Sequence, residues 1–98
     1  MTDPLLASVL ETIRRRSSTA LAQGVELLGV VGSVARGEAG PESDVDIAYG
    51  IVGRPSLFEV GSILMDLQDE LGRRVDMVNI ARVRPALRIA IERDLVRI

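Results

Sequence analysis

The 98-residue sequence contains no cysteine, histidine, lysine or tryptophan, and its only aromatic residues are Tyr49 and Phe58. Without cysteine there is no disulfide bond, no thiolate nucleophile and no zinc–thiolate site. Without histidine the chain lacks the usual general base and the commonest transition-metal ligand. Any metal ion must therefore be held by oxygen ligands, which favour magnesium, manganese or calcium.

The same absences narrow the classes of partner. The chain has twelve arginines but a net charge of −2, so a generally basic surface for nucleic acid is not indicated. So few aromatic residues provide no stacking platform for single-stranded bases. No apolar run is long enough to span a bilayer, and the N-terminal segment lacks the charge order of a signal peptide. We therefore expect a cytoplasmic protein that binds neither membranes nor nucleic acid directly.

The first and last helices are predicted from residues that commonly begin helices. Asp3 followed by Pro4 is typical of a helix N-terminus, and the apolar periodicity that follows predicts a helix over residues 4–23. Residues 14–16 are three consecutive arginines, which we expect to form the solvated face of this helix. Pro85 begins a final helix of about two turns.

A helix in the middle of the chain has clearer boundaries. Ser56 and Glu59 have the spacing of a capping box, and Gly72 is typical of a helix C-terminus. The expected buried stripe of this helix consists of Leu57, Val60, Leu64, Leu67 and Leu71.

Strands are predicted over residues 25–31, 44–52, 73–80 and 95–98, where apolar residues alternate or run together between turn residues. The segment between the first two strands is too short for a full crossover helix, so these strands are expected to be antiparallel. The length is that of one domain, residues 1–98. We predict an α/β (α+β-like) fold, in which helices pack on a small mixed sheet of three to four strands.

Three aspartates in the predicted strands suggest a site for cations. Asp44 and Asp46 are two residues apart, so both point to one face of the strand while their apolar neighbours point to the other. Two adjacent carboxylates repel each other unless a cation lies between them. Asp76 lies in the third strand, again between apolar residues. If this strand lies beside the second, three carboxylates converge on one open face of the sheet, a group suited to hard divalent cations.

A Gly-Ser turn upstream suggests a site for phosphate. Gly32 and Ser33 follow the first strand at a turn into a helical segment, where exposed backbone N–H groups suit phosphate oxygens. Gly32 lets a phosphate approach the backbone, Ser33 adds a hydroxyl donor, and Arg36 could add a charged hydrogen bond. A phosphate-binding turn beside metal-binding carboxylates is the layout of two-metal phosphoryl transfer.

Each of these features also has a simpler explanation. A Gly-Ser turn is usually only a turn, an Asp-x-Asp pair is often the exposed face of an edge strand, and Asp76 alone could be a solvated acid. Their joint occurrence in this order, after a buried strand, favours the phosphoryl-transfer interpretation.

The segment GSVARGEAGPESDVDI, residues 32–47, resembles the signature of the polymerase-β-type nucleotidyltransferase superfamily, in which Gly-Ser precedes Asp-x-Asp. The Ala35-Arg36-Gly37 and Ser43-Asp44 details resemble the minimal nucleotidyltransferase (MNT) proteins, which prokaryotes pair with HEPN-domain ribonuclease toxins. The resemblance covers nearly the whole chain, including Asp76 and the closing ALRIAIERDLVRI.

The resemblance implies roles for these residues. Asp44 and Asp46 would hold two Mg²⁺ ions, or Mn²⁺, that bind ATP. Asp76 would sit on the catalytic metal and help the acceptor hydroxyl to lose its proton. The residues that would bind the nucleotide are Gly32, Ser33, Arg36 and Ser43.

The implied reaction is in-line attack on the α-phosphate of ATP, which transfers AMP and releases pyrophosphate. In HEPN/MNT pairs the acceptor is a tyrosine of the toxin, so the resemblance implies an antitoxin enzyme with a HEPN-domain partner. Many nucleotidyltransferases hold the acceptor with a second domain, and its absence here also leads us to expect a partner protein. Two alternatives stay open: transfer to a small-molecule hydroxyl, and a non-catalytic module that masks the toxin.

Overall fold

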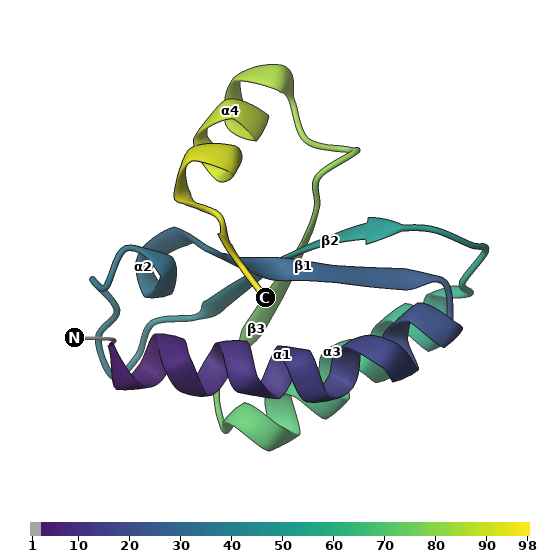
Figure 1. The fold of residues 1–98 in the computed structure, drawn as a ribbon, viewed down its shortest axis with the longest axis horizontal. Coiled ribbons are helices and arrows are strands. Elements are labelled where there is room, and N and C mark those ends of the chain that lie inside the picture. Colours follow the sequence, from purple (N-terminus) through teal and green to yellow (C-terminus); the bar gives the residue numbers. More distant parts are fainter. Residues whose placement is uncertain (1–2) are drawn as a thin grey trace.

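The computed structural model describes residues 3–98, which form four helices and one four-stranded sheet (Figure 1). In chain order the elements are α1 (Pro4–Ala22), β1 (Val25–Val31), α2 (Gly32–Ala35), β2 (Val45–Ile51), α3 (Leu57–Leu71), β3 (Val75–Asn79), α4 (Pro85–Asp94) and β4 (Val96–Arg97). Among the described residues no helix is both long and apolar enough to cross a membrane.

The strands lie in the order β3-β2-β1-β4. β1 pairs antiparallel with both β2 and β4, whereas β2 and β3 run parallel. The prediction of a mixed sheet, with an antiparallel pair formed by the first two strands, is therefore confirmed. A β-bulge between Leu27 and Gly29 shifts the register of β1 against β2, so that Val30 lies opposite Ile47 and Val31 lies opposite Asp46.

Helices cover both faces of the sheet. α1 and α3 lie side by side on one face, and α4 projects from the other (Figure 1). The main core lies under α1 and α3 and includes the fully buried Ile13, Ile47 and Leu67. A smaller cluster, Val31, Ala48 and Ile91, lies between the sheet and α4. The sheet face that carries the acids is therefore partly covered by α4, not open as the sequence suggested.

The helix boundaries follow from the predicted capping residues. Asp3 Oδ1 accepts hydrogen bonds from the backbone N–H groups of Leu5 at 2.8 Å and Leu6 at 3.3 Å. Ser56 and Glu59 form both hydrogen bonds of a capping box, at 3.0 and 3.1 Å. These side chains satisfy N–H groups that have no partner inside their own helix.

Two expectations about helices were wrong. Leu57 is 91% exposed, because it is the first residue of α3 and the packed stretch of that helix begins only at Val60. α4 has ten residues, more than the two turns expected, and among the described residues of this helix only Ile91 is buried.

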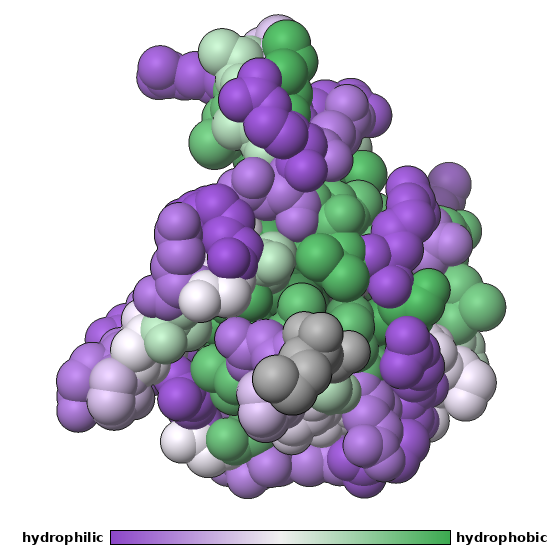
Figure 2. Space-filling model, turned by 60° about the vertical axis from the view of Figure 1, so that its left-hand side comes forward, coloured by the Kyte–Doolittle hydropathy of each residue, from purple (hydrophilic) through white to green (hydrophobic). Residues whose placement is uncertain are grey.

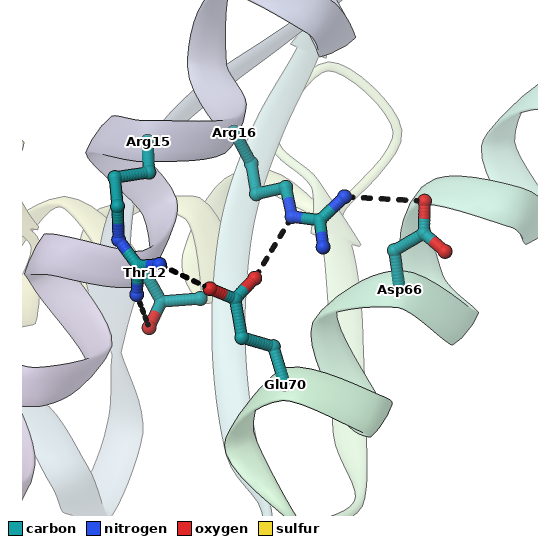
Figure 3. A network of polar contacts seen from close by, with 5 residues as sticks. All are labelled: Thr12, Arg15, Arg16, Asp66 and Glu70. Carbon is teal, nitrogen blue, oxygen red and sulfur yellow. Dashed lines mark hydrogen bonds and ion pairs between the residues drawn. The ribbon is translucent and has the colours of Figure 1, made fainter.

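The arginines of α1 are not simply a solvated face. Arg15 and Arg16 both contact Glu70 of α3, at 2.6 and 2.8 Å, and Arg16 also reaches Asp66 at 3.4 Å (Figure 3). The hydrogen bond to Arg16 is the main cause that lowers the pKa of Glu70, and the charges of both arginines act in the same direction. This group of ion pairs joins the two helices on the outside of the core.

Candidate active site

Two of the three predicted carboxylates come from neighbouring strands. Asp46 in β2 is the direct register partner of Asp76 in β3. Adjacent strands lie about 4.8 Å apart, and side chains at paired positions point to the same face. Asp44 is one residue before the start of β2 and two residues before Asp46. The structure therefore places Asp46 between Asp76 on one side and Val31 of β1 on the other.

The ionised form of the Asp46 carboxylate is disfavoured by its surroundings. Its half-buried position raises its pKa above the ordinary value, and the negative charges of Asp76 and Asp44 raise the pKa further. The positive charge of Arg36 opposes these effects. Two neighbouring acids thus act on Asp46 at this end of the sheet, and a single arginine offsets their effect.

Gly32 lies directly against Asp46. Its φ is +74°, in the left-handed region, and a Cβ atom at this position would collide with Oδ2 of Asp46. Only glycine meets both conditions without strain. The Gly-Ser turn and the Asp-x-Asp pair are therefore in contact, as the sequence interpretation required.

The loop before Asp44 is held by Arg73, which lies in the turn between α3 and β3. Arg73 Nη1 donates to the carbonyl oxygens of Gly40 at 3.0 Å and Ser43 at 3.1 Å. The hydroxyl of Ser43 accepts a hydrogen bond from the backbone N–H of Gly40 at 2.9 Å. Ser43 therefore shapes this loop, and its predicted contact with nucleotide stays a prediction.

Arg36 follows α2 directly and is paired with two acids. Its Nε contacts Glu38 at 2.8 Å, and its Nη1 contacts Asp94, the last residue of α4, at 2.7 Å. The guanidinium therefore links the Gly-Ser turn to the helix on the opposite side of the site.

A cavity of about 320 Å³ lies between the turn, the sheet and α4. Gly32, Arg36 and Asp46 line it from the turn and the sheet, and Leu87, Ala90 and Asp94 are among its lining residues from α4. Figure 2 shows hydrophobic surface in the hollow below α4, with hydrophilic side chains around it. The cavity thus has mainly apolar walls, with two carboxylates and one guanidinium among its lining residues.

Within residues 3–98, no three side chains of the metal-binding types His, Cys, Asp and Glu are close enough to hold a metal ion by themselves. Asp46 and Asp76 are register partners and the pKa of Asp46 is raised, but the binding of cations by these acids stays a prediction. A cavity of about 400 Å³ at Ser17, Glu26 and Arg97 includes none of the predicted site residues.

Two residues near the site were not singled out from the sequence. Arg73 gave no local signal, because its two carbonyl partners are thirty or more residues away along the chain. Asp94 did give a local signal in the sequence, because an acid at the C-terminus of a predicted helix interacts unfavourably with the helix dipole.

Comparisons with known proteins identify the family to which the chain belongs. Residues 7–98 match the family described as nucleotidyltransferase domain. The protein adenylyltransferase MntA of Thermococcus cleftensis is 37% identical over 73 residues, which cover 74% of each chain.

Two solved structures share the fold. A structure of a minimal nucleotidyltransferase has a TM-score of 0.72 and 33% identity, and the match covers 91% of this chain and 95% of that one. A crystal structure of a toxin–antitoxin with AMP-PNP has a TM-score of 0.58 and 20% identity, and the match covers 83% of this chain and 61% of that one. The predicted mixed α/β architecture is therefore confirmed.

Proposed function

The chain belongs to the nucleotidyltransferase domain family and is a nucleotidyltransferase, and from this premise we propose that it transfers AMP from ATP to a hydroxyl group of another protein. The observation that carries the proposal is the contact of Gly32 with Asp46, beside Asp76. It brings a turn suited to phosphate within reach of carboxylates suited to cations. The name of the MntA relative, a protein adenylyltransferase, supports a protein as the acceptor.

Divalent cations suit this group of acids. Burial raises the pKa of Asp46, the charges of Asp76 and Asp44 raise it further, and a bound cation would offset this repulsion. Carboxylate and phosphate oxygens are the ligands that Mg²⁺ prefers. We propose that Asp44, Asp46 and Asp76 hold two Mg²⁺ ions together with the phosphates of ATP. When bound, Mg²⁺ neutralises negative charge on the attacking and leaving oxygens.

The residues of the chain then have distinct tasks. Gly32, Ser33 and Arg36 would bind the β- and γ-phosphates and so direct the α-phosphate toward the acids. Asp76 is exposed and would accept the proton of the acceptor hydroxyl at a carboxylate oxygen. The hydroxyl oxygen forms a bond to the α-phosphorus, the bond from this phosphorus to the β-phosphate breaks, and pyrophosphate leaves.

We further propose that the acceptor is a tyrosine of a HEPN-domain toxin and that the protein acts in the cytoplasm as its antitoxin. The support is the resemblance of GSVARGEAGPESDVDI to the MNT signature, together with the adenylyltransferase relative. The toxin–antitoxin structure shares the fold with this chain and supports the fold alone, not the partner.

The experiment is intact mass spectrometry of the co-expressed toxin, with the parent protein and with the Asp44→Asn/Asp46→Asn variant. A matched control is Asp69→Asn, which removes an exposed acid from α3. We expect the toxin to gain the mass of AMP with the parent and the control only. Undiminished transfer by the double variant would refute the catalytic role of the two acids. An unchanged toxin mass with toxicity still suppressed would favour masking instead.

A further inference from the structure

We infer that Asp94 is a positioning residue of the nucleotide site, which holds the guanidinium of Arg36 in place to bind the triphosphate of ATP. This inference rests on the proposed function, because it assumes that Arg36 contacts phosphate. Asp94 itself would not touch the nucleotide.

Asp94 and Glu38 form ion pairs with two different nitrogen atoms of Arg36. Asp94 Oδ2 lies 2.7 Å from Nη1 of Arg36, and Glu38 Oε1 lies 2.8 Å from Nε. The side chain of Asp94 is 25% exposed and that of Glu38 is 63% exposed, so Asp94 is the more enclosed partner. Ion pairs that are shielded from water are weakened less by solvent and salt. Asp94 is therefore the partner whose ion pair with Arg36 is screened less by solvent.

The position of Asp94 in α4 is otherwise unfavourable. It is the last residue of the helix, where the dipole favours basic side chains and disfavours acids. Local rules of this kind are commonly broken at functional sites. The neighbouring Glu92 shows the ordinary case, since it pairs with Arg88 one turn away on the exposed face of the same helix. Asp94 instead reaches across to Arg36, fifty-eight residues away along the chain.

The arrangement leaves donors for a ligand. A guanidinium has five N–H groups, of which the two acids engage one at Nε and one at Nη1. With both contacts made, the plane of the group is fixed, and the remaining N–H groups are suited to bidentate binding of a phosphate. Arg36, Asp94, Gly32 and Asp46 all line the same cavity of about 320 Å³. The oriented guanidinium therefore lies at the edge of the cavity that also contains the Gly-Ser turn.

The test compares nucleotide affinities of Asp94→Asn, Arg36→Ala and the double variant with those of the parent. Titration calorimetry is performed with the Mg²⁺ complex of a non-hydrolysable ATP analogue and, separately, with AMP. We expect Asp94→Asn to weaken binding of the analogue roughly 10-fold and to leave AMP binding unchanged, since AMP lacks the β- and γ-phosphates. Glu92→Gln is the matched control, from the same helix, and should bind as the parent does.

The double variant isolates the role of Arg36. If Asp94 acts through Arg36, adding Asp94→Asn to Arg36→Ala should weaken binding no further, because residues in one ion pair are not additive. The inference would be overturned if Asp94→Asn weakened binding of the analogue further in the Arg36→Ala background. It would also be overturned if Asp94→Asn alone bound the analogue as tightly as the parent does, or more tightly. Tighter binding would mean that Asp94 competes with phosphate. If Asp94→Asn does not fold, Asp94→Glu is used; a few-fold weakening is expected, and parent-like affinity would count against the inference.

The outcomes also separate this inference from the proposed function. If Arg36→Ala binds the ATP analogue as the parent does, Arg36 is no phosphate ligand and the inference fails, while the roles of Asp44 and Asp46 are untouched. If the Asp44→Asn/Asp46→Asn variant still transfers AMP, the catalytic proposal fails, whatever the effect of Asp94 on affinity.

Discussion

Asp46 and Asp76 are register partners on adjacent parallel strands, with their carboxylates on the same face of the sheet. Asp46 is half-buried, and both burial and the charge of Asp76 raise its pKa. Paired acids of this kind cost stability in a protein without a bound cation. The fold therefore maintains a repulsive pair of acids at the place where we propose that metal and phosphate bind.

Asp46→Asn should stabilise the metal-free protein at neutral pH. An acid whose pKa is raised by folding keeps its proton in the folded state after the unfolded chain has lost it. Its contribution to stability is therefore greatest below the ordinary value of 3.8 and is lost as the pH rises through the folded-state pKa. We expect a melting temperature a few degrees above that of the parent at pH 7, in the presence of a chelator. The difference should shrink toward pH 3.

Two comparisons check the cause of this effect. Asp69→Asn, on the exposed face of α3, should change the melting temperature little at any pH. Added Mg²⁺ and ATP should raise the melting temperature of the parent but not of Asp46→Asn, since a ligand stabilises only the state that binds it. A lower melting temperature for metal-free Asp46→Asn would contradict the repulsion between the acids.

Gly32→Ala should lose both stability and activity. The backbone φ of +74° disfavours any residue with a Cβ atom, and this Cβ would displace the carboxylate of Asp46. The left-handed conformation alone costs about 1–2 kcal/mol. Chemical denaturation should show at least that loss in the free energy of unfolding, and transfer of AMP should fall sharply.

Gly61→Ala is the matched control, because a Cβ at this position in α3 would meet no atom within 4 Å. Alanine is the better helix former, so we expect a gain of about 0.5–1 kcal/mol and unchanged activity. Equal effects of the two substitutions would show that contact with Asp46 does not explain the requirement for Gly32.

Glu70→Gln should destabilise the contact between α1 and α3 in a way that depends on pH and salt. The pKa of Glu70 is lowered, first by the hydrogen bond to Arg16 and also by the charge of Arg15. A lowered pKa contributes stability above the ordinary value of 4.5, which is lost as the pH falls through the folded-state pKa. The melting temperature should therefore drop slightly at pH 7 in low salt, and the drop should be smaller at acid pH or in about 1 M salt.

Glu92→Gln serves as a control for this surface effect, because Glu92 pairs only with Arg88 within α4 among the described residues. It should change the melting temperature less than Glu70→Gln does. An unchanged melting temperature for Glu70→Gln at pH 7 in low salt would show that these ion pairs contribute nothing measurable, as is common on protein surfaces.

The features that were predicted correctly depend on short stretches of chain. The Asp3 cap, the Ser56–Glu59 capping box and the antiparallel connection of the first two strands each involve residues close in sequence. The alternation of Val45, Asp46 and Ile47 likewise places Asp46 and the core on opposite faces of β2. Local hydrogen bonding and side-chain period decide these features, so the sequence alone is sufficient.

The features that were missed depend on how distant elements pack. Arg16 meets Glu70, and Arg36 meets Asp94, over fifty-four and fifty-eight residues of chain. No periodicity or spacing predicts such pairs, because they exist only after α1, α3 and α4 have taken their places on the sheet. The cover that α4 provides over Asp46 belongs to the same class. These contacts surround the candidate site, so the sequence could suggest the acids as site residues but could not predict what packs around them.

Asp76→Ala should separate binding of the nucleotide from chemistry. Asp44 and Asp46 are proposed to serve both metal ions, so their loss should weaken nucleotide binding as well as turnover. Asp76 lies on β3, at the edge of the sheet, and is exposed, which suits contact with an incoming hydroxyl group. Such a contact matters mainly in the transition state. The variant should therefore bind ATP–Mg²⁺ nearly as well as the parent but transfer AMP on the order of 100-fold more slowly or worse.

Calorimetry with a non-hydrolysable ATP analogue and single-turnover rates measure the two effects of Asp76→Ala separately. Glu42→Ala, which removes an exposed acid from the loop before Asp44, controls for the loss of negative charge near the site. Equal transfer rates for the parent and Asp76→Ala would remove Asp76 from the active site. A collapse of ATP affinity would show that Asp76 serves to bind the metal–nucleotide complex. Only a slow rate with near-parent affinity fits a group that positions and deprotonates the acceptor, because the ground-state complex then forms without it.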